Sequence, residues 1–174
     1  TPRITRGAKI TFKNEYGNYT TRAVAPSHQF AEKTIVSSGR YLNDTDIKQK
    51  KKVAVIGRLV SRDLFGEKDP IGKFIDIGKT VFKVVGVFKD SGGDNEERFI
   101  YIPYTTRQKM EKATKKIGSI IVAFKSEIGN SGALAFEKQL REYLKQKKFF
   151  LCNLKNWFRF KINIYFSCQC KNYN

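Results

Sequence analysis

The sequence contains little of the chemistry from which active sites and metal centres are usually built. His28 is the only histidine in 174 residues, and the three cysteines, Cys152, Cys168 and Cys170, all lie near the end of the chain. The body of the chain therefore lacks a histidine and cysteine ligand set for a metal and needs no disulfide bond. Ser27 and His28 are sequence neighbours, but no Gly-x-Ser-x-Gly elbow accompanies them. We expect no catalytic residue, no cofactor and no metal site, with His28 on a helix surface.

Long apolar segments are also missing. A membrane-spanning helix requires roughly 20 predominantly apolar residues, and the longest candidate, residues 149–170, is interrupted by three basic residues. The chain opens on Thr1 without the apolar region of a signal peptide. These features are what we expect of a domain excised from a longer protein.

Acidic residues are scarce relative to basic ones. The chain has 34 Lys and Arg against 16 Asp and Glu, a formal net charge of +18. Such a charge usually indicates a nucleic acid, an anionic membrane surface or an acidic partner. A basic run, residues 48–52, could contact phosphates of a nucleic acid or of lipid headgroups. Because the run has no aromatic residue to stack on a base, a solvated turn is the favoured interpretation.

The hydrophobic content of 40% is typical of a folded globular domain, and the pattern mixes strands with helices. Alternation of Ala8, Ile10 and Phe12 predicts a strand, and turn residues 14–18 lead into a returning strand at 19–25. Ser27 is a candidate cap for a short helix ending near residue 33. Further strands are predicted at 52–56, 72–77, 80–88, 99–102 and 119–125, and further helices at 60–65, 105–115 and 133–148. The last helix is predicted to be amphipathic, with an apolar stripe of Leu134, Phe136, Leu140, Tyr143 and Leu144.

The segment from Gly39 to Thr106 carries the most informative pattern. It reads Gly39-Arg40-Tyr41-Leu42, Val53-Ala54-Val55-Ile56-Gly57, Leu64-Phe65-Gly66, Asp69-Pro70-Ile71-Gly72-Lys73, Phe82-Lys83-Val84-Val85-Gly86-Val87 and Ile102-Pro103-Tyr104-Thr105-Thr106. This succession of short apolar runs and glycines resembles the MacB-type periplasmic core domain of MacB/FtsX-like ABC transporter permeases. Domains of this family lie outside the cytoplasmic membrane, between the first two transmembrane helices of the permease.

The resemblance implies an α+β fold of two lobes. A small, mostly-β, Sabre-like lobe would comprise residues 39–106. It would be inserted into a porter-like α+β lobe formed by residues 1–38 and 107–148. The basic, aromatic tail at residues 149–174 departs from the family pattern, so the porter-like lobe is expected to be incomplete.

The resemblance also implies a function without chemistry of its own. Cytoplasmic ATP hydrolysis in such permeases is coupled to conformational change of the periplasmic domains, for export of a drug, peptide or lipoprotein substrate. The implied partners are a second permease copy, an ABC ATPase domain or subunit, the membrane through flanking helices and, in some members, a periplasmic adaptor protein. The implied location is the cell inner membrane, with this domain on the periplasmic side.

One acidic loop is a candidate docking site. Asp90, Asp94, Glu96 and Glu97 surround a pair of glycines in a spacing that fits no EF-hand. A solvated hairpin tip is the preferred interpretation. Because the resemblance implies that loops far from the membrane contact partner proteins, partner docking by this tip is retained as a hypothesis.

Two other motifs have simpler structural interpretations. The segment Gly66–Phe74 superficially resembles a phosphate-binding loop, but its glycine spacing is wrong and Pro70 removes a backbone N–H. A turn at residues 69–72 that leads into a strand is favoured. Arg40 lies near Asp44 and Asp46, and a structural ion pair is expected for it rather than a ligand contact.

Two other classes of function remain open. A basic nucleic-acid-binding module would explain the charge but not the ordered series of motifs, and no recognition helix or stacking platform is apparent. An interaction or signalling domain of the same fold, without a role in transport, is the other alternative. An enzyme is the least supported class.

Overall fold

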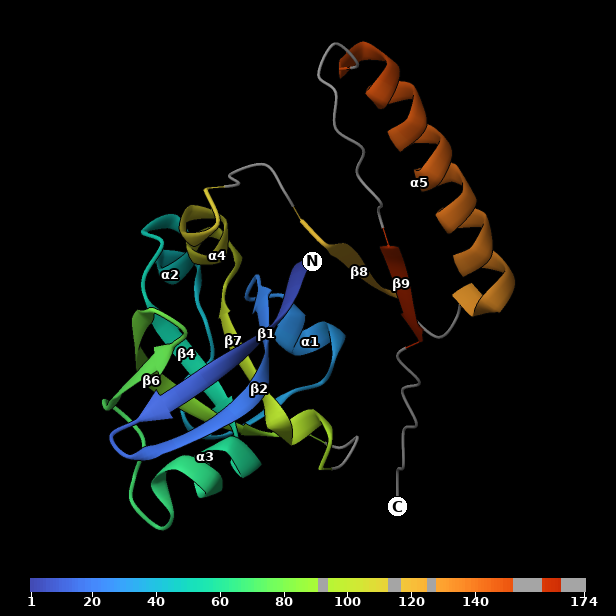
Figure 1. The fold of residues 1–174 in the computed structure, drawn as a ribbon. Coiled ribbons are helices and arrows are strands. Elements are labelled where there is room, and N and C mark those ends of the chain that lie inside the picture. Colours follow the sequence, from blue (N-terminus) through green and yellow to red (C-terminus); the bar gives the residue numbers. More distant parts are fainter. Residues whose placement is uncertain (91–93, 113–116, 125–127, 152–160, 167–174) are drawn as a thin grey trace, which may run out of the picture.

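The computed structural model describes residues 1–90, 94–112, 117–124, 128–151 and 161–166, whose arrangement is shown in Figure 1. The predicted α+β class is confirmed. The strands are β1 (Pro2–Phe12), β2 (Glu15–Val24), β3 (Ile35–Gly39), β4 (Val53–Gly57), β5 (Phe74–Ile77), β6 (Thr80–Lys89), β7 (Phe99–Pro103), β8 (Ser119–Phe124) and β9 (Lys161–Phe166). The helices are α1 (His28–Ala31), α2 (Asp44–Lys48), α3 (Arg58–Phe65), α4 (Tyr104–Met110) and α5 (Gly129–Leu151), and η1 (Glu96–Arg98) is a 3₁₀ turn.

Six of the strands close on themselves into a barrel-like sheet. The hydrogen-bonded order is β2, β7, β4, β6, β5, β1, and β1 then pairs with β2 again. The β2–β7 and β4–β6 pairs are parallel, whereas the other four are antiparallel. Closure depends on Ile10 and Thr11 of β1, which pair with Ile77 and Asp76 of β5. β3 pairs in antiparallel fashion with the last residues of β6, Gly86 to Lys89.

Alternating apolar residues of these strands fill the interior of the closed sheet. Ile10 is fully buried, and Ala8 and Phe12 pack against the same core, as the alternation predicted. α3 covers one end of the sheet, where the rings of Phe65 and Phe12 lie 4.2 Å apart. Gly66 ends this helix with a φ of 61°, a conformation that favours glycine. The predicted helix stop is therefore confirmed.

The β1–β2 hairpin has a tighter turn than predicted. Residues 14–18 were expected to form the turn, but Glu15 already belongs to β2 and only Lys13 and Asn14 connect the strands. Lys13 adopts a φ of 54°. Two-residue connections with positive φ match the natural twist of paired strands. The paired strands therefore favour a two-residue turn, although the polar composition of residues 14–18 indicated a longer one.

A second apolar cluster lies on the other side of β4 and β7. It combines Tyr41 and Leu42 from the loop after β3 with Val55, Phe88 and Tyr101 from the sheet. The Tyr101 ring stacks on Phe88 at 4.7 Å between ring centroids. This cluster forms one wall of the polar site described below.

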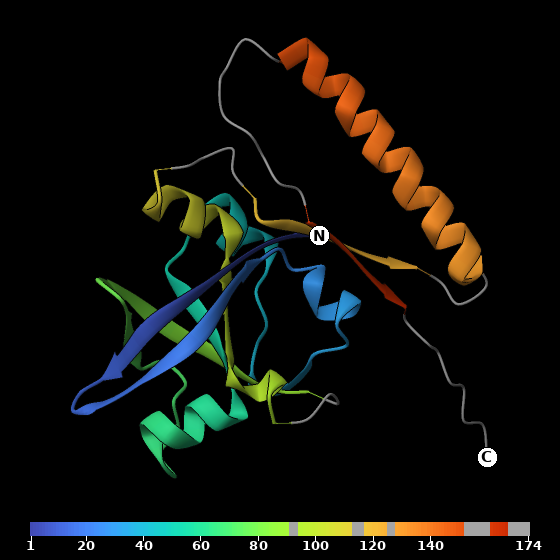
Figure 2. The ribbon, with the colours of Figure 1, turned by 45° about the vertical axis from the view of Figure 1, so that its right-hand side comes forward.

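β8, α5 and β9 form a unit attached through β1. Pro2 and Arg3 pair with Ile120 and Ser119 of β8, and β8 pairs in parallel with β9. α5 lies beyond these strands, away from the closed sheet, in both views (Figures 1 and 2). The predicted helix is confirmed, but its apolar stripe is largely solvent-exposed: Leu134 and Tyr143 are 62% and 55% exposed. The division into porter-like and Sabre-like lobes stays a prediction.

Candidate functional site

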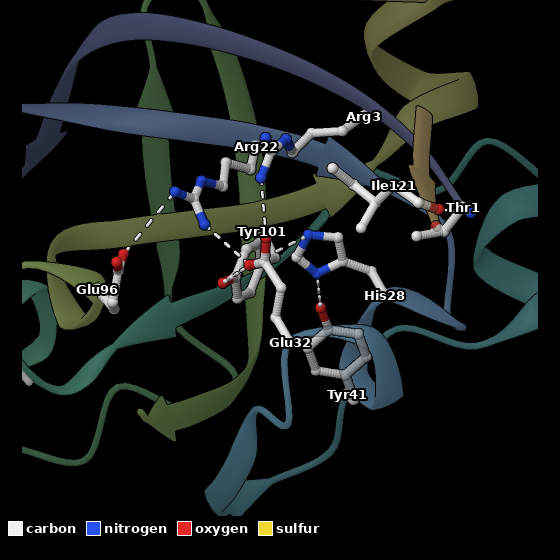
Figure 3. Close-up of polar contacts among 9 residues, drawn as sticks. All are labelled: Thr1, Arg3, Arg22, His28, Glu32, Tyr41, Glu96, Tyr101 and Ile121. Atoms are coloured by element: carbon white, nitrogen blue, oxygen red, sulfur yellow. Dashed lines mark hydrogen bonds and ion pairs between the residues drawn. The ribbon is translucent and has the colours of Figure 1, made fainter. Parts of the chain in front are cut away.

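A largely buried carboxylate contacts side chains from three strands near the point where β8 joins the closed sheet (Figure 3). Glu32 follows α1, and its Oε1 accepts a hydrogen bond from Arg3 Nη1 of β1 at 2.8 Å. Its Oε2 accepts from Arg22 Nη1 of β2 at 2.9 Å and from the Tyr101 hydroxyl of β7 at 3.4 Å. The side chains of Glu32, Arg3 and Arg22 are only 11%, 8% and 15% exposed. We call Arg3, Arg22, His28, Glu32 and Tyr101 the polar junction.

His28 lies inside this junction rather than on a helix surface, so the surface position predicted for it is wrong. Its side chain is fully buried, with Nε2 3.3 Å from Glu32 Oε2 and Nδ1 3.3 Å from the Tyr41 hydroxyl. α1 has only four residues, too few for a hydrophobic period to show which face is buried. The spacing of four residues between His28 and Glu32 was the available signal, because such residues share one helix face.

Burial and charge act in opposite directions on the two groups. Burial lowers the pKa of His28, and the neighbouring Glu32 offsets only part of this effect. Burial alone would raise the pKa of Glu32, but its contacts with His28, Arg22 and Arg3 together lower the pKa below its ordinary value. At neutral pH the junction therefore contains a neutral imidazole and an ionised carboxylate held by two guanidinium groups.

Arg22 extends the junction toward the acidic loop. Its guanidinium lies 3.6 Å from the centroid of the Phe99 ring, and its Nη2 is 3.8 Å from Glu96. Arg3, at the other end, pairs through its backbone with Ser119 of β8. The junction thus connects the β8 side of the molecule with the loop that precedes β7.

The four acidic candidates lie between the end of β6 and the start of β7, but in different environments. Glu97 is buried, and its Oε2 accepts a hydrogen bond from Arg58 Nε at 2.7 Å, while its Oε1 accepts from the backbone N–H of Asp90 at 3.3 Å. Asp94 is exposed and lies 3.5 Å from Arg58 Nη2. Glu96 pairs with Arg22, as described above. Glu97 therefore holds the loop in place, whereas Asp94 and Glu96 face outward; docking by this loop stays a prediction.

Arg40 makes the structural ion pair that was expected. Its Nη1 and Nη2 donate to the two carboxylate oxygens of Asp46, at 2.6 Å and 3.1 Å. Asp46 is fully buried and also accepts from the backbone N–H of Asn43, whose side chain caps α2. Residues 48–52, at the end of α2 and directly after it, are all exposed, as predicted for a solvated turn.

The segment that superficially resembled a phosphate-binding loop is a turn. Asp69 Oδ1 accepts a hydrogen bond from the backbone N–H of Ile71 at 3.0 Å, and the backbone N–H of Lys73 donates to Pro70 O at 3.1 Å. Gly72 has a φ of 81° at the entry to β5. The two hydrogen bonds and the positive φ of Gly72 explain why the sequence Asp-Pro-Ile-Gly occurs at this turn. The cysteine pair Cys168 and Cys170 lies outside the described residues.

The described part of the chain contains neither a metal-binding cluster nor a membrane-spanning helix. Its His, Cys, Asp and Glu side chains do not gather in threes in a way that could hold a metal ion. Within the same residues, no helix is both long enough and apolar enough to cross a lipid bilayer.

Sequence comparisons with known families and proteins agree with one another. The family model described as "MacB-like periplasmic core domain" matches residues 1–135. A macrolide export ATP-binding/permease protein MacB from Bdellovibrio bacteriovorus is 36% identical over 102 residues, which are 56% of this chain. The corresponding protein of Chlorobium luteolum is 29% identical over 133 residues, or 75% of this chain. The matched segments are only 16% and 20% of those two proteins.

Solved structures show the same fold. The periplasmic region of MacB from Actinobacillus actinomycetemcomitans matches with a TM-score of 0.65 at 18% identity, covering 89% of this chain and 76% of that one. The extracellular domain of the ABC-type transporter YknZ from Gram-positive bacteria matches with a TM-score of 0.59 at 22% identity, covering 67% of this chain and 59% of that one.

Proposed function

The chain belongs to the family of MacB-like periplasmic core domains, and on this premise we propose that it is the non-catalytic, extracytoplasmic domain of an ABC transporter permease. The observation that carries the proposal is the family match over residues 1–135, which spans the closed sheet and β8. In this role the domain transmits movement that originates in cytoplasmic ATP hydrolysis. Its relatives are macrolide exporters by name, and the cargo of this permease would be a drug, a peptide or a lipoprotein.

The architecture supports transmission of movement rather than chemistry. The closed sheet has no free edge along its six-strand circuit, and its core is packed with aliphatic and aromatic side chains. A domain of this kind moves as one rigid body. A force applied to β8 reaches the closed sheet through Arg3, which pairs with Ser119 by its backbone and with Glu32 by its side chain.

The proposed assembly contains a second permease copy and an ABC ATPase domain or subunit in the inner membrane, with this domain on the periplasmic side. A periplasmic adaptor protein is a further proposed partner. Within this proposal, the acidic loop with Asp90, Asp94, Glu96 and Glu97 is the candidate for its contact, and the outward-facing carboxylates of Asp94 and Glu96 support this.

The first test locates the natural full-length protein with an antibody against this domain. A membrane-embedded band well above the 20.0 kDa of this chain, cleaved by protease only from the outer side, is the expected result. A soluble cytoplasmic band near 20.0 kDa would overturn the proposal.

The second test measures movement in the full-length permease. With Cys152, Cys168, Cys170 and any cysteine of the remaining permease replaced by serine, a spin label at Lys48→Cys reports the distance between two copies in the membrane. We expect this distance to change between the nucleotide-free and ATP-bound states. A matched control, with labels at both Lys48→Cys and Lys89→Cys in one copy of the domain, is expected to show an unchanged distance. A distance between copies that is the same in every nucleotide state would contradict the proposed coupling.

A further inference from the structure

Three large apolar side chains are exposed on one outer face of the closed sheet. Tyr16 of β2, Phe74 of β5 and Val81 of β6 are 68%, 61% and 51% exposed. The strand registers place Tyr16 and Val81 at the two ends of one row across the sheet: Tyr16 pairs with Thr11, Thr11 pairs with Asp76, and Asp76 pairs with Val81. Phe74 lies two residues along the same face of β5, since Asp76 and Phe74 point to the same side. Single exposed apolar residues are common on protein surfaces, but three large ones on one face of a sheet are not.

Lysines surround this apolar group. The ammonium group of Lys9 lies over the Tyr16 ring, 4.1 Å from its centroid. Lys83 pairs with Phe74 in the β5–β6 ladder, and its backbone N–H donates to Lys52 O at 3.0 Å. The exposed basic run that ends at Lys52 is therefore continuous with the apolar group, a relationship that the sequence alone did not indicate. We call Lys9, Tyr16, Lys52, Phe74, Val81 and Lys83 the basic–apolar surface.

These lysines differ from the arginines of the molecule. Arg3, Arg22, Arg40 and Arg58 are each paired with a carboxylate of the chain itself. Among the described residues, no ion pair is formed by Lys9, Lys52 or Lys83, and all three are exposed. Asp76 is the one carboxylate in the row described above. The positive charge of this face is thus available to an external anion.

We infer that the basic–apolar surface binds the headgroup region of an anionic lipid bilayer. Lysines with neighbouring aromatic and aliphatic side chains suit this environment, because ammonium groups attract lipid phosphates while apolar side chains enter the boundary with the acyl chains. The inference rests on the proposed function in one respect: a domain tethered to a membrane meets its lipid at high effective concentration.

Lipid is favoured over single-stranded nucleic acid for two structural reasons. Base-stacking platforms use successive exposed aromatic rings, whereas Tyr16 and Phe74 are separated by the Thr11–Asp76 pair and one face of Tyr16 is covered by Lys9. Val81, the third apolar residue, offers no ring on which a base could stack. It can, however, be inserted between lipid headgroups.

The test measures co-sedimentation of the 174-residue chain with vesicles. Vesicles of phosphatidylglycerol mixed with phosphatidylcholine are the probe, and vesicles of phosphatidylcholine alone are the neutral reference. We expect binding only to the anionic vesicles, and weaker binding as salt is raised. A triple variant, Lys9→Gln, Lys52→Gln and Lys83→Gln, should bind about 100-fold more weakly, since each lysine near an anionic surface contributes roughly fivefold.

A matched control removes the same number of positive charges at positions outside the basic–apolar surface. Lys89→Gln, Lys112→Gln and Lys138→Gln replace three exposed lysines outside the surface and should reduce binding far less. A second variant, Phe74→Ser with Val81→Ser, keeps the charge but should also weaken binding. Because all these positions are exposed, the variants should keep the far-UV circular dichroism of the wild-type chain.

Four outcomes would overturn the inference. These are no binding to anionic vesicles, equal binding to neutral vesicles, equal loss in the control triple variant, or tighter binding of a single-stranded oligonucleotide that the lysine variant abolishes. The last outcome would assign the surface to nucleic acid. Failure here is distinguishable from failure of the proposed function, because the distance between labelled copies of the permease is measured independently of vesicle binding.

Discussion

Arg3 of β1 donates a hydrogen bond to Glu32, the residue after α1, at 2.8 Å, although they are 29 positions apart in the sequence. This contact sits next to the pairing of β1 with β8. The buried carboxylate therefore does two things: it holds the strands of the closed sheet together, and it joins that sheet to the unit formed by β8, α5 and β9.

Glu32→Gln is expected to lower the free energy of unfolding by about 3–5 kcal/mol, because removing one partner from a buried ion pair leaves uncompensated charge, here on Arg3 and Arg22. Urea denaturation followed by circular dichroism measures the effect. Glu67→Gln, at an exposed position after α3, is the control and should change stability by no more than about 0.5 kcal/mol. Equal effects of the two substitutions would contradict the assignment of Glu32.

Acidification should destabilise the protein in two separate steps. The pKa of His28 is lower in the folded state than its ordinary 6.5, so the unfolded chain binds the proton more readily. The contribution of His28 to the free energy of unfolding is therefore fully present above about pH 6.5. It decreases as the pH falls below this value, by at most about 1.4 kcal/mol per pH unit for one proton. The pKa of Glu32 is also lowered, from 4.5, so its contribution is lost only at more acidic pH.

The single histidine makes this prediction easy to check. His28→Gln should remove the first step, which begins near the ordinary histidine pKa of 6.5, while leaving the loss at lower pH. Urea midpoints measured across this range for both proteins provide the comparison. A first step of the same size in His28→Gln would show that some other group is responsible.

Gly57→Ala should destabilise the domain by about 1–3 kcal/mol or more, as overpacking of a close contact does. An added Cβ at this position would lie 2.0 Å from the carbonyl oxygen of Glu97, so the loop that carries the acidic candidates must shift. Thermal unfolding measures the loss. Gly7→Ala is the control, because a Cβ there meets no atom within 4 Å, and it should be neutral or slightly stabilising.

Arg3→Gln should reduce movement of the domain in the full-length permease. The proposed function requires Arg3 to transmit force between β8 and Glu32, so the ATP-dependent change in the distance between labelled copies should shrink. Arg107→Gln is the matched control: Arg107 is also buried, but its Nη2 donates to Thr21 of β2 rather than to the junction. Equal losses in both variants would indicate general destabilisation instead of a transmission role for Arg3.

Local elements could be predicted from the sequence, but long-range closure could not. The alternation around Ile10, the end of the helix predicted at residues 60–65 and the strand predicted at 80–88 are signals carried by a few adjacent residues, and all three are confirmed. The pairing of Ile10 with Ile77 joins residues 67 positions apart, and no local pattern encodes it. The MacB-like resemblance supplied the fold class, which the comparisons confirm.

The polar junction was missed because each member looks ordinary by itself. Arg3 and Arg22 occur among many basic residues, and Tyr101 stands in an apolar run that predicts only a strand. Their inward orientation follows from the strand register, and strand register depends on the closure of the sheet. The acidic loop was recognised from composition, but composition could not indicate that Glu97 turns inward to Arg58 while Asp94 stays outside.

The double use of β1 has a consequence for how this sequence can vary. Along one edge β1 is aligned with β2, and along the other it meets β8 near its start and β5 near its end. Deleting a single residue from the middle of β1 would reverse the facing of every side chain on one side of the deletion. Either Ile10 would leave the core or Arg3 would lose its contact with Glu32. A single deletion in the middle of β1 would therefore disrupt either the closed sheet or its attachment to β8.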